Sequence, residues 1–297
     1  MTLLHTHVEE GAGFFDEVIL HGITETLRLI PFLFITYLLM EFIEHKGSDK
    51  AERFMRRAGR FGPFVGGLLG AVPQCGFSAA ASGLYSGGVI SVGTLIAVFL
   101  STSDEMLPIL LSGEVAIHTA LFILLYKAVA AIAVGLLVDL GLHLAGKDKR
   151  NIDIDELCEI DNCHCEKGIF YSALHHTITI TLFVFAVTVA LGALVFFVGE
   201  ETIGNALDGI PVLSHLLAAL VGLIPNCAVS VALAKLATEG IISAGVMLSG
   251  LFSGAGVGLL VMLRTSRDKR AVLFTVLILV ISGVLLGLLG ELLFTIV

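Results

Sequence analysis

Two stretches decide the fold: Pro73-Gln74-Cys75-Gly76-Phe77-Ser78 and its second copy, Pro225-Asn226-Cys227-Ala228-Val229-Ser230. The alignment of residues 73–95 with 225–247 needs no gap, and nine of the 23 positions are identical. Both copies lie inside apolar sequence, where a proline interrupts a helix. A helix break repeated at matching points in the two halves of a membrane chain is typical of a transporter's binding site.

The composition is that of a membrane protein. Hydrophobic residues make up 56% of the 297 residues and charged residues 14%, which leaves too few polar side chains to cover a soluble domain. The N-terminus has no basic start and several acidic residues, so we expect no signal peptide. The five cysteines are too few and too scattered for a disulfide framework, and we expect free thiols.

Eight apolar segments are long enough to enter a bilayer: 18–43, 62–86, 88–110, 116–144, 171–198, 211–237, 241–262 and 271–296. Segments 62–86 and 211–237 have roughly ten apolar residues on each side of the Pro-x-Cys break, and ten helical residues rise about 15 Å, half of a hydrocarbon core of about 30 Å. Each is therefore either a broken span or a re-entrant hairpin with the motif at its tip.

The charged loops favour hairpins. Basic residues outside the apolar segments gather at 46–60, 147–167 and 264–270, whereas the remaining loops carry acidic residues. The positive-inside rule places all three groups in the cytoplasm only if both segments are hairpins. We therefore predict an all-α polytopic membrane protein with two inverted-topology repeats, each of three full spans plus one re-entrant helical hairpin. The alternative is a duplicated fold in which proline and glycine only kink the helices.

This topology divides the chain into four segments. They are an extracytoplasmic tail (1–17), the first inverted repeat (18–145), a cytosolic acidic linker that contains Cys and His (146–170) and the second inverted repeat (171–297). Both termini are predicted to lie outside the cytoplasmic (inner) membrane, with the lipid bilayer as a partner. We expect no cofactor, no nucleic-acid partner and no enzymatic activity, and a homo-oligomer is compatible with this organisation.

The hairpin tips form the first candidate site. At the midplane the returning half-helix exposes free amides, to which side chains of the tip add further polar groups. The candidate substrate contacts are Gln74, Cys75, Ser78, Asn226, Cys227 and Ser230. The two thiols would face each other across the pseudo-symmetry axis and suit a soft metal. Alternatively, each cysteine is a small apolar side chain that fills a tight turn.

The stretch 101–105, Ser-Thr-Ser-Asp-Glu, lies inside the predicted span 88–110. Two adjacent carboxylates are costly in a bilayer, so a cation or a shared proton would stabilise them. The candidates for metal or proton coupling are Asp104, Glu105 and Glu25, and the further candidate substrate contacts are Ser101, Ser103 and Ser253. In the equivalent stretch 253–257 glycines are expected to unwind the span. Alternatively, the carboxylates lie near the outer mouth.

Two further features are a pair of charged residues within one span and the ligands of the linker. Lys127 and Asp139 lie far apart in one span, and we expect each to snorkel or to find a partner on another element. The linker offers soft ligands for cytosolic metal capture, at a spacing unlike that of zinc fingers; they are Cys158, Cys163, His164 and Cys165. A disordered acidic tether is the alternative for this linker.

Taken together, the motifs resemble those of a family of proposed ten-span heavy-metal exporters, whose members are labelled arsenic-efflux-like or manganese transporters. The resemblance rests on residues 73–78, 101–108, 163–165 and 225–227 and covers nearly the whole chain. It implies a metal or metalloid ion as cargo.

We therefore expect a secondary active transporter that exports a heavy-metal or metalloid ion, either a divalent metal such as manganese or an arsenic-like ion. An ion gradient is expected to supply the energy because the chain has no nucleotide-binding loop, and Asp104 and Glu105 make protons the expected coupling ion. One alternative is an inorganic oxyanion transporter, because half-helix N-termini suit anions. Others are a membrane lipid-phosphate hydrolase, which would need cationic clamps that the tips largely lack, and a metal sensor.

Overall fold

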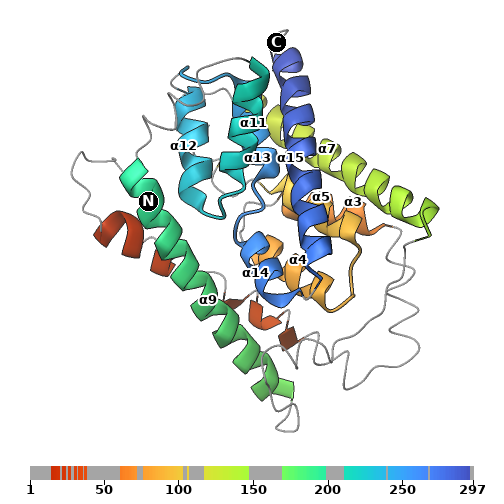
Figure 1. Ribbon diagram of the computed structural model, residues 1–297, viewed down its shortest axis with the longest axis vertical. Coiled ribbons are helices and arrows are strands. Elements are labelled where there is room, and N and C mark those ends of the chain that lie inside the picture. Colours follow the sequence, from red (N-terminus) through yellow and green to blue (C-terminus); the bar gives the residue numbers. More distant parts are fainter. Residues whose placement is uncertain are drawn as a thin grey trace.

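The computed structural model shows an all-helical protein (Figure 1). It describes residues 15–20, 22–24, 26–27, 30–31, 33–35, 37–38, 61–71, 76–102, 106, 117–146, 169–198, 211–238, 240–266 and 268–294. No strand occurs among these residues, in agreement with the predicted all-α class. Most of the tail 1–17 and of the linker 146–170 lies outside the described part, so their predicted roles stay predictions.

The described helices fall into two similar series. They are η1 (Phe15–Leu20), α3 (Gly62–Gly70), α4 (Gly76–Ser86), α5 (Val92–Ser101), α7 (Ile117–Leu144), α9 (Ile169–Val198), α11 (Pro211–Gly222), α12 (Cys227–Thr238), α13 (Ala244–Ser253), α14 (Val257–Thr265) and α15 (Lys269–Phe294). When residues 152 positions apart are paired, α3, α4, α5 and α7 correspond to α11, α12, α13 and α15. In both series, three short helices are followed by a long one in the same order.

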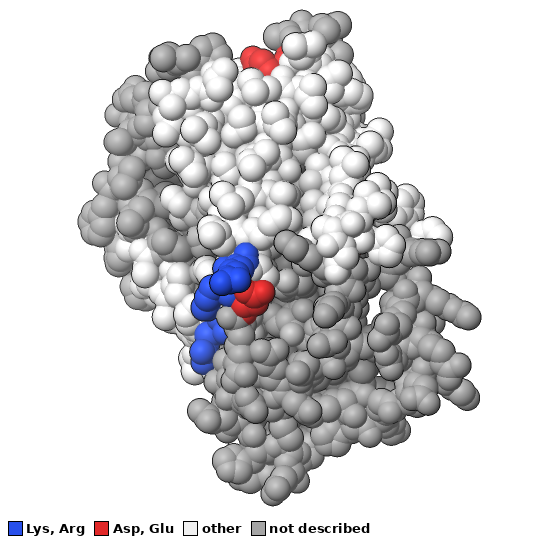
Figure 2. Space-filling model, turned by 45° about the vertical axis from the view of Figure 1, so that its right-hand side comes forward, with Lys and Arg blue, Asp and Glu red and all other residues white. Residues whose placement is uncertain are grey.

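The long helices are suited to a bilayer. Within the described ranges, four segments are long and apolar enough to cross one: Ile117–Leu144, Ala173–Ala190, Ala244–Thr265 and Lys269–Leu293. Helix α15 exposes apolar side chains along its length, including Leu277, Leu285 and Leu289. Figure 2 shows a broad uncharged surface, with basic residues and an adjacent acidic residue at one level and further acidic atoms near the upper end. The chain is therefore a multi-pass membrane protein.

Two pairs of short helices lie among the long ones. Helices α11 and α12 have 12 residues each, and 12 residues rise about 18 Å, too little for a core of about 30 Å. They are joined by 223–226, which includes Pro225, while α3 and α4 flank the first copy of the motif. In Figure 1, α11 and α12 lie in the upper part of the view, and α4 lies below them beside α14.

The span predicted at 241–262 is interrupted, as its glycines indicated. Helix α13 ends at Ser253 and α14 begins at Val257. Between them Gly256 has φ 52° and ψ −145°, a backbone conformation that is essentially restricted to glycine. The expected unwinding of this segment is confirmed.

The prediction of a continuous span over 88–110 is wrong, because α5 ends at Ser101 and Thr102 has φ −52° and ψ 129°. The hydroxyls of Ser101 and Thr102 both donate to the carbonyl of Val98, at 3.0 and 2.8 Å. Serine and threonine hydroxyls that bond to a preceding carbonyl compete with the helix ladder and favour its bending. This local competition explains a helix end where the sequence has neither glycine nor proline.

The two halves repeat their contacts as well as their helices. Ser91 Oγ and the amide of Gly93 donate to the Asp139 carboxylate at 2.6 and 3.0 Å, so that α7 caps the N-terminus of α5. In the second half Ser243 Oγ and the amide of Gly245 donate to Glu291 at 2.5 and 3.0 Å, so that α15 caps α13. A carboxylate at a helix N-terminus meets free amides and the positive end of the dipole. Asp139 has thus found its partner on another element.

Helices from different halves also pack together. Ser82 Oγ of α4 donates to the carbonyl of Gly258 in α14 at 2.7 Å, and Ser86 Oγ lies 2.6 Å from Thr265 Oγ1. A Cβ at Gly258 would collide with the Ser78 carbonyl, so this crossing depends on glycine. The returning helix of the first short pair is therefore attached to the interrupted span of the second half.

Candidate functional site

The tip of the second short pair packs against α9. Asn226 is buried. Its side-chain Nδ2 donates to the carbonyl of Thr188 at 3.2 Å, and its backbone N–H donates to the carbonyl of Ile224 at 2.8 Å. The side chain predicted as a substrate contact therefore also anchors the tip to α9. Cys227 begins α12, directly after this anchor.

Helix α9 brings threonine hydroxyls to the same region. Thr177, Thr181 and Thr188 are spaced by four and seven residues, which places them on one face. Thr177 Oγ1 donates to the carbonyl of Ala173 at 2.7 Å. The hydroxyl oxygens of Thr181 and Thr188 are buried and have no hydrogen-bond partner among the described residues. Buried hydroxyls usually have one, so this face can accept a polar ligand or water.

The four predicted serine contacts within the described residues, Ser78, Ser101, Ser230 and Ser253, all lie in helices. Ser78 is buried in the first turn of α4, and Ser230 lies half-buried in the first turn of α12. Ser101 and Ser253 are fully buried at the ends of α5 and α13. Ser253 Oγ bonds to the carbonyls of Ala219 at 2.6 Å and Gly250 at 3.0 Å. A hydroxyl that donates to backbone can still accept a hydrogen bond or offer its oxygen to a cation.

Lys127 is the polar residue whose environment differs most from what the sequence suggests. It belongs to the 28-residue helix α7, yet its exposed fraction is 0%. Its Nζ donates to the carbonyl of Thr102 at 2.7 Å and to that of Leu251 at 2.8 Å. The lysine therefore does not snorkel, and it joins the end of α5 to the last turn of α13. The sequence feature that indicates this buried site is a charged residue in the middle of an apolar span.

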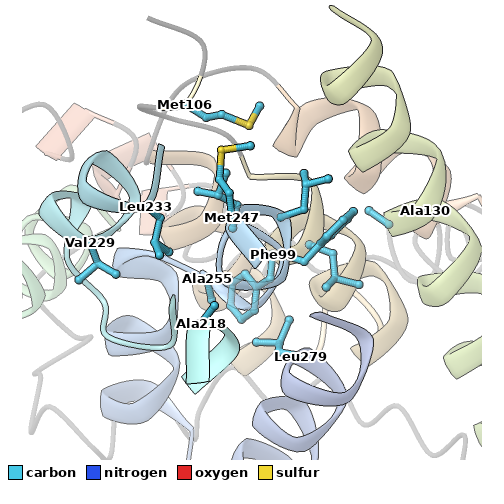
Figure 3. Packing of buried hydrophobic residues seen from close by; sticks show 14 of the residues in the cluster. Phe99, Met106, Ala130, Ala218, Val229, Leu233, Met247, Ala255 and Leu279 are labelled. Carbon is cyan, nitrogen blue, oxygen red and sulfur yellow. The ribbon is translucent and has the colours of Figure 1, made fainter. Parts of the chain in front are cut away.

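A sulfur-containing apolar cluster lies beside the two interruptions. Met106 and Met247 are fully buried members of the main core, and Figure 3 shows their thioethers at the same end of the cluster. Phe99 from α5 and Ala255 from the second interruption belong to the same core. Thioethers are soft donors, although buried methionine is more often a flexible core residue.

Several predicted site residues lie outside the described residues. They are Glu25, Gln74, Cys75, Ser103, Asp104, Glu105, Cys158, Cys163, His164 and Cys165. The backbone of Cys227 is described but its side chain is not. Within the described part of the chain, no three His, Cys, Asp or Glu side chains are grouped so that they could hold a metal ion. The predicted thiol and carboxylate ligands therefore stay predictions.

Comparison with known protein families places the first half of the chain. Residues 22–167 match the model of a family described as "Putative, 10TM heavy-metal exporter". This range includes the first Pro-x-Cys motif, the acidic stretch 101–105 and the linker cysteines. No curated protein and no solved structure matches the chain. The match confirms the resemblance drawn from these motifs.

Proposed function

We propose that this chain, whose residues 22–167 match the heavy-metal exporter family, is a secondary active transporter of a metal or metalloid ion. Export across the cytoplasmic membrane, coupled to protons, is the mode of action that we propose. The observation that carries this proposal is the meeting of two interrupted helices, one from each half, at a fully buried lysine. Irregular backbone at membrane depth is tolerated where it lines a site or a cavity.

The two halves are proposed to be inverted repeats. The repeated carboxylate caps at Asp139 and Glu291 support an internal duplication, because each caps the helix that follows a short pair. The position of α4 below α11 and α12 along the long axis of the molecule supports entry of the short pairs from opposite faces (Figure 1). Alternating access would then be a rocking of one half against the other.

We propose that the cargo contacts are the two tip thiols, Cys75 and Cys227, with Asp104 as a coupling carboxylate. The test is ion transport into vesicles that contain purified C75S, C227S or D104N protein. Loss of transport in these variants is expected, because each lacks a proposed ligand or proton carrier. D268N is the control, since Asp268 is an exposed carboxylate next to α15. Full activity of all three site variants would remove this site.

An oxyanion is the second candidate cargo, and the buried Lys127 is the observation that favours it. An ammonium group and half-helix N-termini both attract anions. A binding assay in which divalent cations and oxyanions compete on the same purified protein separates the two candidates. Displacement by oxyanions alone would replace the metal proposal.

A further inference from the structure

The ammonium group of Lys127 lies between carbonyls from two helix ends. The carbonyl of Thr102 directly follows α5, and that of Leu251 belongs to the last turn of α13. The helical partner of the Leu251 carbonyl would be the amide of Ala255, which lies beyond the helix end. Both oxygens are therefore at C-terminal helix ends, where carbonyls lack intrahelical donors and carry partial negative charge.

The described groups around Nζ are those that bind a cation. Besides the two carbonyl oxygens, the ring of Phe252 lies with its centroid 5.4 Å from Nζ, a distance at which an aromatic ring attracts a positive charge. Carbonyl oxygens at helix ends are also the groups with which discontinuous membrane helices coordinate metal ions. The environment that holds the lysine would hold an inorganic cation by the same forces.

The fold itself does not require a lysine at this place. The residue 152 positions later is Leu279, which is fully buried on α15. The equivalent helix pairs, α5 with α7 and α13 with α15, are both in contact. A leucine fills the corresponding place in one half, so packing alone does not explain the buried charge in the other.

We propose that Lys127 is a built-in cation that competes with the transported cation for the carbonyl oxygens of Thr102 and Leu251. Two positive charges within one coordination distance repel each other strongly in a medium of low polarity. The ammonium and the cargo would therefore occupy these oxygens in alternation. This inference rests on the proposed function, and it specifies a cation with oxygen ligands, such as Mn²⁺, in place of an oxyanion.

The test is Mn²⁺ binding to purified wild-type, K127M, K127Q and K127R protein, by calorimetry. K127M and K127Q remove the charge, and we expect them to bind Mn²⁺ about tenfold or more tightly than wild type. K127R keeps the charge and should not bind more tightly. L279M is the matched control, a similar-volume change at the equivalent buried position, and should bind as wild type does.

Each outcome decides between the proposals. Unchanged or weaker Mn²⁺ binding by both neutral variants, with size-exclusion profiles like that of wild type, overturns the competition. If K127M does not fold, the result for K127Q decides. Loss of arsenate binding in the neutral variants, without a gain for Mn²⁺, would make Lys127 an anion ligand instead. Metal transport by wild-type vesicles tests the proposed function separately, because it can succeed while the competition fails.

Discussion

The helix break after α5 and the break between α13 and α14 are flanked by equivalent capping residues, but other residues at the two breaks differ. In both, a carboxylate from a long helix caps the preceding short helix, and a buried serine lies at its end. The first half contributes Lys127, whose Nζ donates to the carbonyl of Thr102 after α5 and to that of Leu251 in α13, and it has Asp104 in its break; the corresponding residues of the second half are Leu279 and Gly256. The shared residues build the scaffold, and in the proposed transporter the residues that differ would set the ion selectivity.

If the scaffold is duplicated, equivalent glycines should be equally intolerant of substitution. A methyl group at Gly70 would collide with the carbonyl of Val98, and one at Gly222 with the carbonyl of Gly250, 152 positions later. We expect G70A and G222A each to lower the free energy of unfolding by about 3 kcal/mol, because backbone atoms cannot yield as flexible side chains do. Thermal unfolding in detergent measures this.

The control for these two variants is G141A, because within the described part of the chain no atom outside the neighbouring helix backbone lies within 4 Å of the place its Cβ would take. It should be neutral or slightly stabilising, since alanine favours a helix interior over glycine. A large loss in only one of G70A and G222A would break the equivalence of the two halves.

The break between α13 and α14 should depend on the backbone conformation of Gly256. G256A is expected to lower the free energy of unfolding by about 2 kcal/mol, because φ 52° and ψ −145° suit glycine alone. Gly254 lies in the same break with φ −71°, and its Cβ would be 3.4 Å from the nearest atoms, so G254A is the matched control. Similar melting temperatures for both variants would show that the backbone here is not as described.

The carboxylate caps should contribute equally in the two halves. D139N and E291Q each keep the shape of the side chain but replace the charged carboxylate, which accepts a hydrogen bond from Ser91 or Ser243, with a neutral amide. We expect each to cost about 1 kcal/mol in the free energy of unfolding. D268N, at an exposed position, should cost less. A neutral effect of either cap variant would contradict the shared scaffold.

The smallest expected difference concerns the two buried serines. Ser253 Oγ bonds to carbonyls of α11 and α13, whereas Ser101 Oγ bonds to the carbonyl of Val98 within its own helix. S253A should therefore cost about 1 kcal/mol and S101A about half as much. The same unfolding assay compares them, and the reverse order would contradict the tie between α11 and α13.

The sequence predicts the parts of this structure that depend on local signals. Proline at 225 and glycines at 254 and 256 mark two of the breaks, and the length of the apolar segments marks the long helices. The end of α5 was missed, because it depends on two hydroxyls that bond to Val98 rather than on a helix breaker. The partners of Asp139 and Lys127 were missed because they are 25 or more residues away in sequence.

The opposite entry of the two short helix pairs is tested most directly by cysteine labelling from each side of the membrane. In a background without native cysteines, single cysteines replace Phe61 and Ser86 around the first pair and Val212 and Ile241 around the second. An impermeant maleimide should label the first two from the cytoplasmic side and the last two from the outside. Labelling of positions 61 and 86 from different sides would contradict the account.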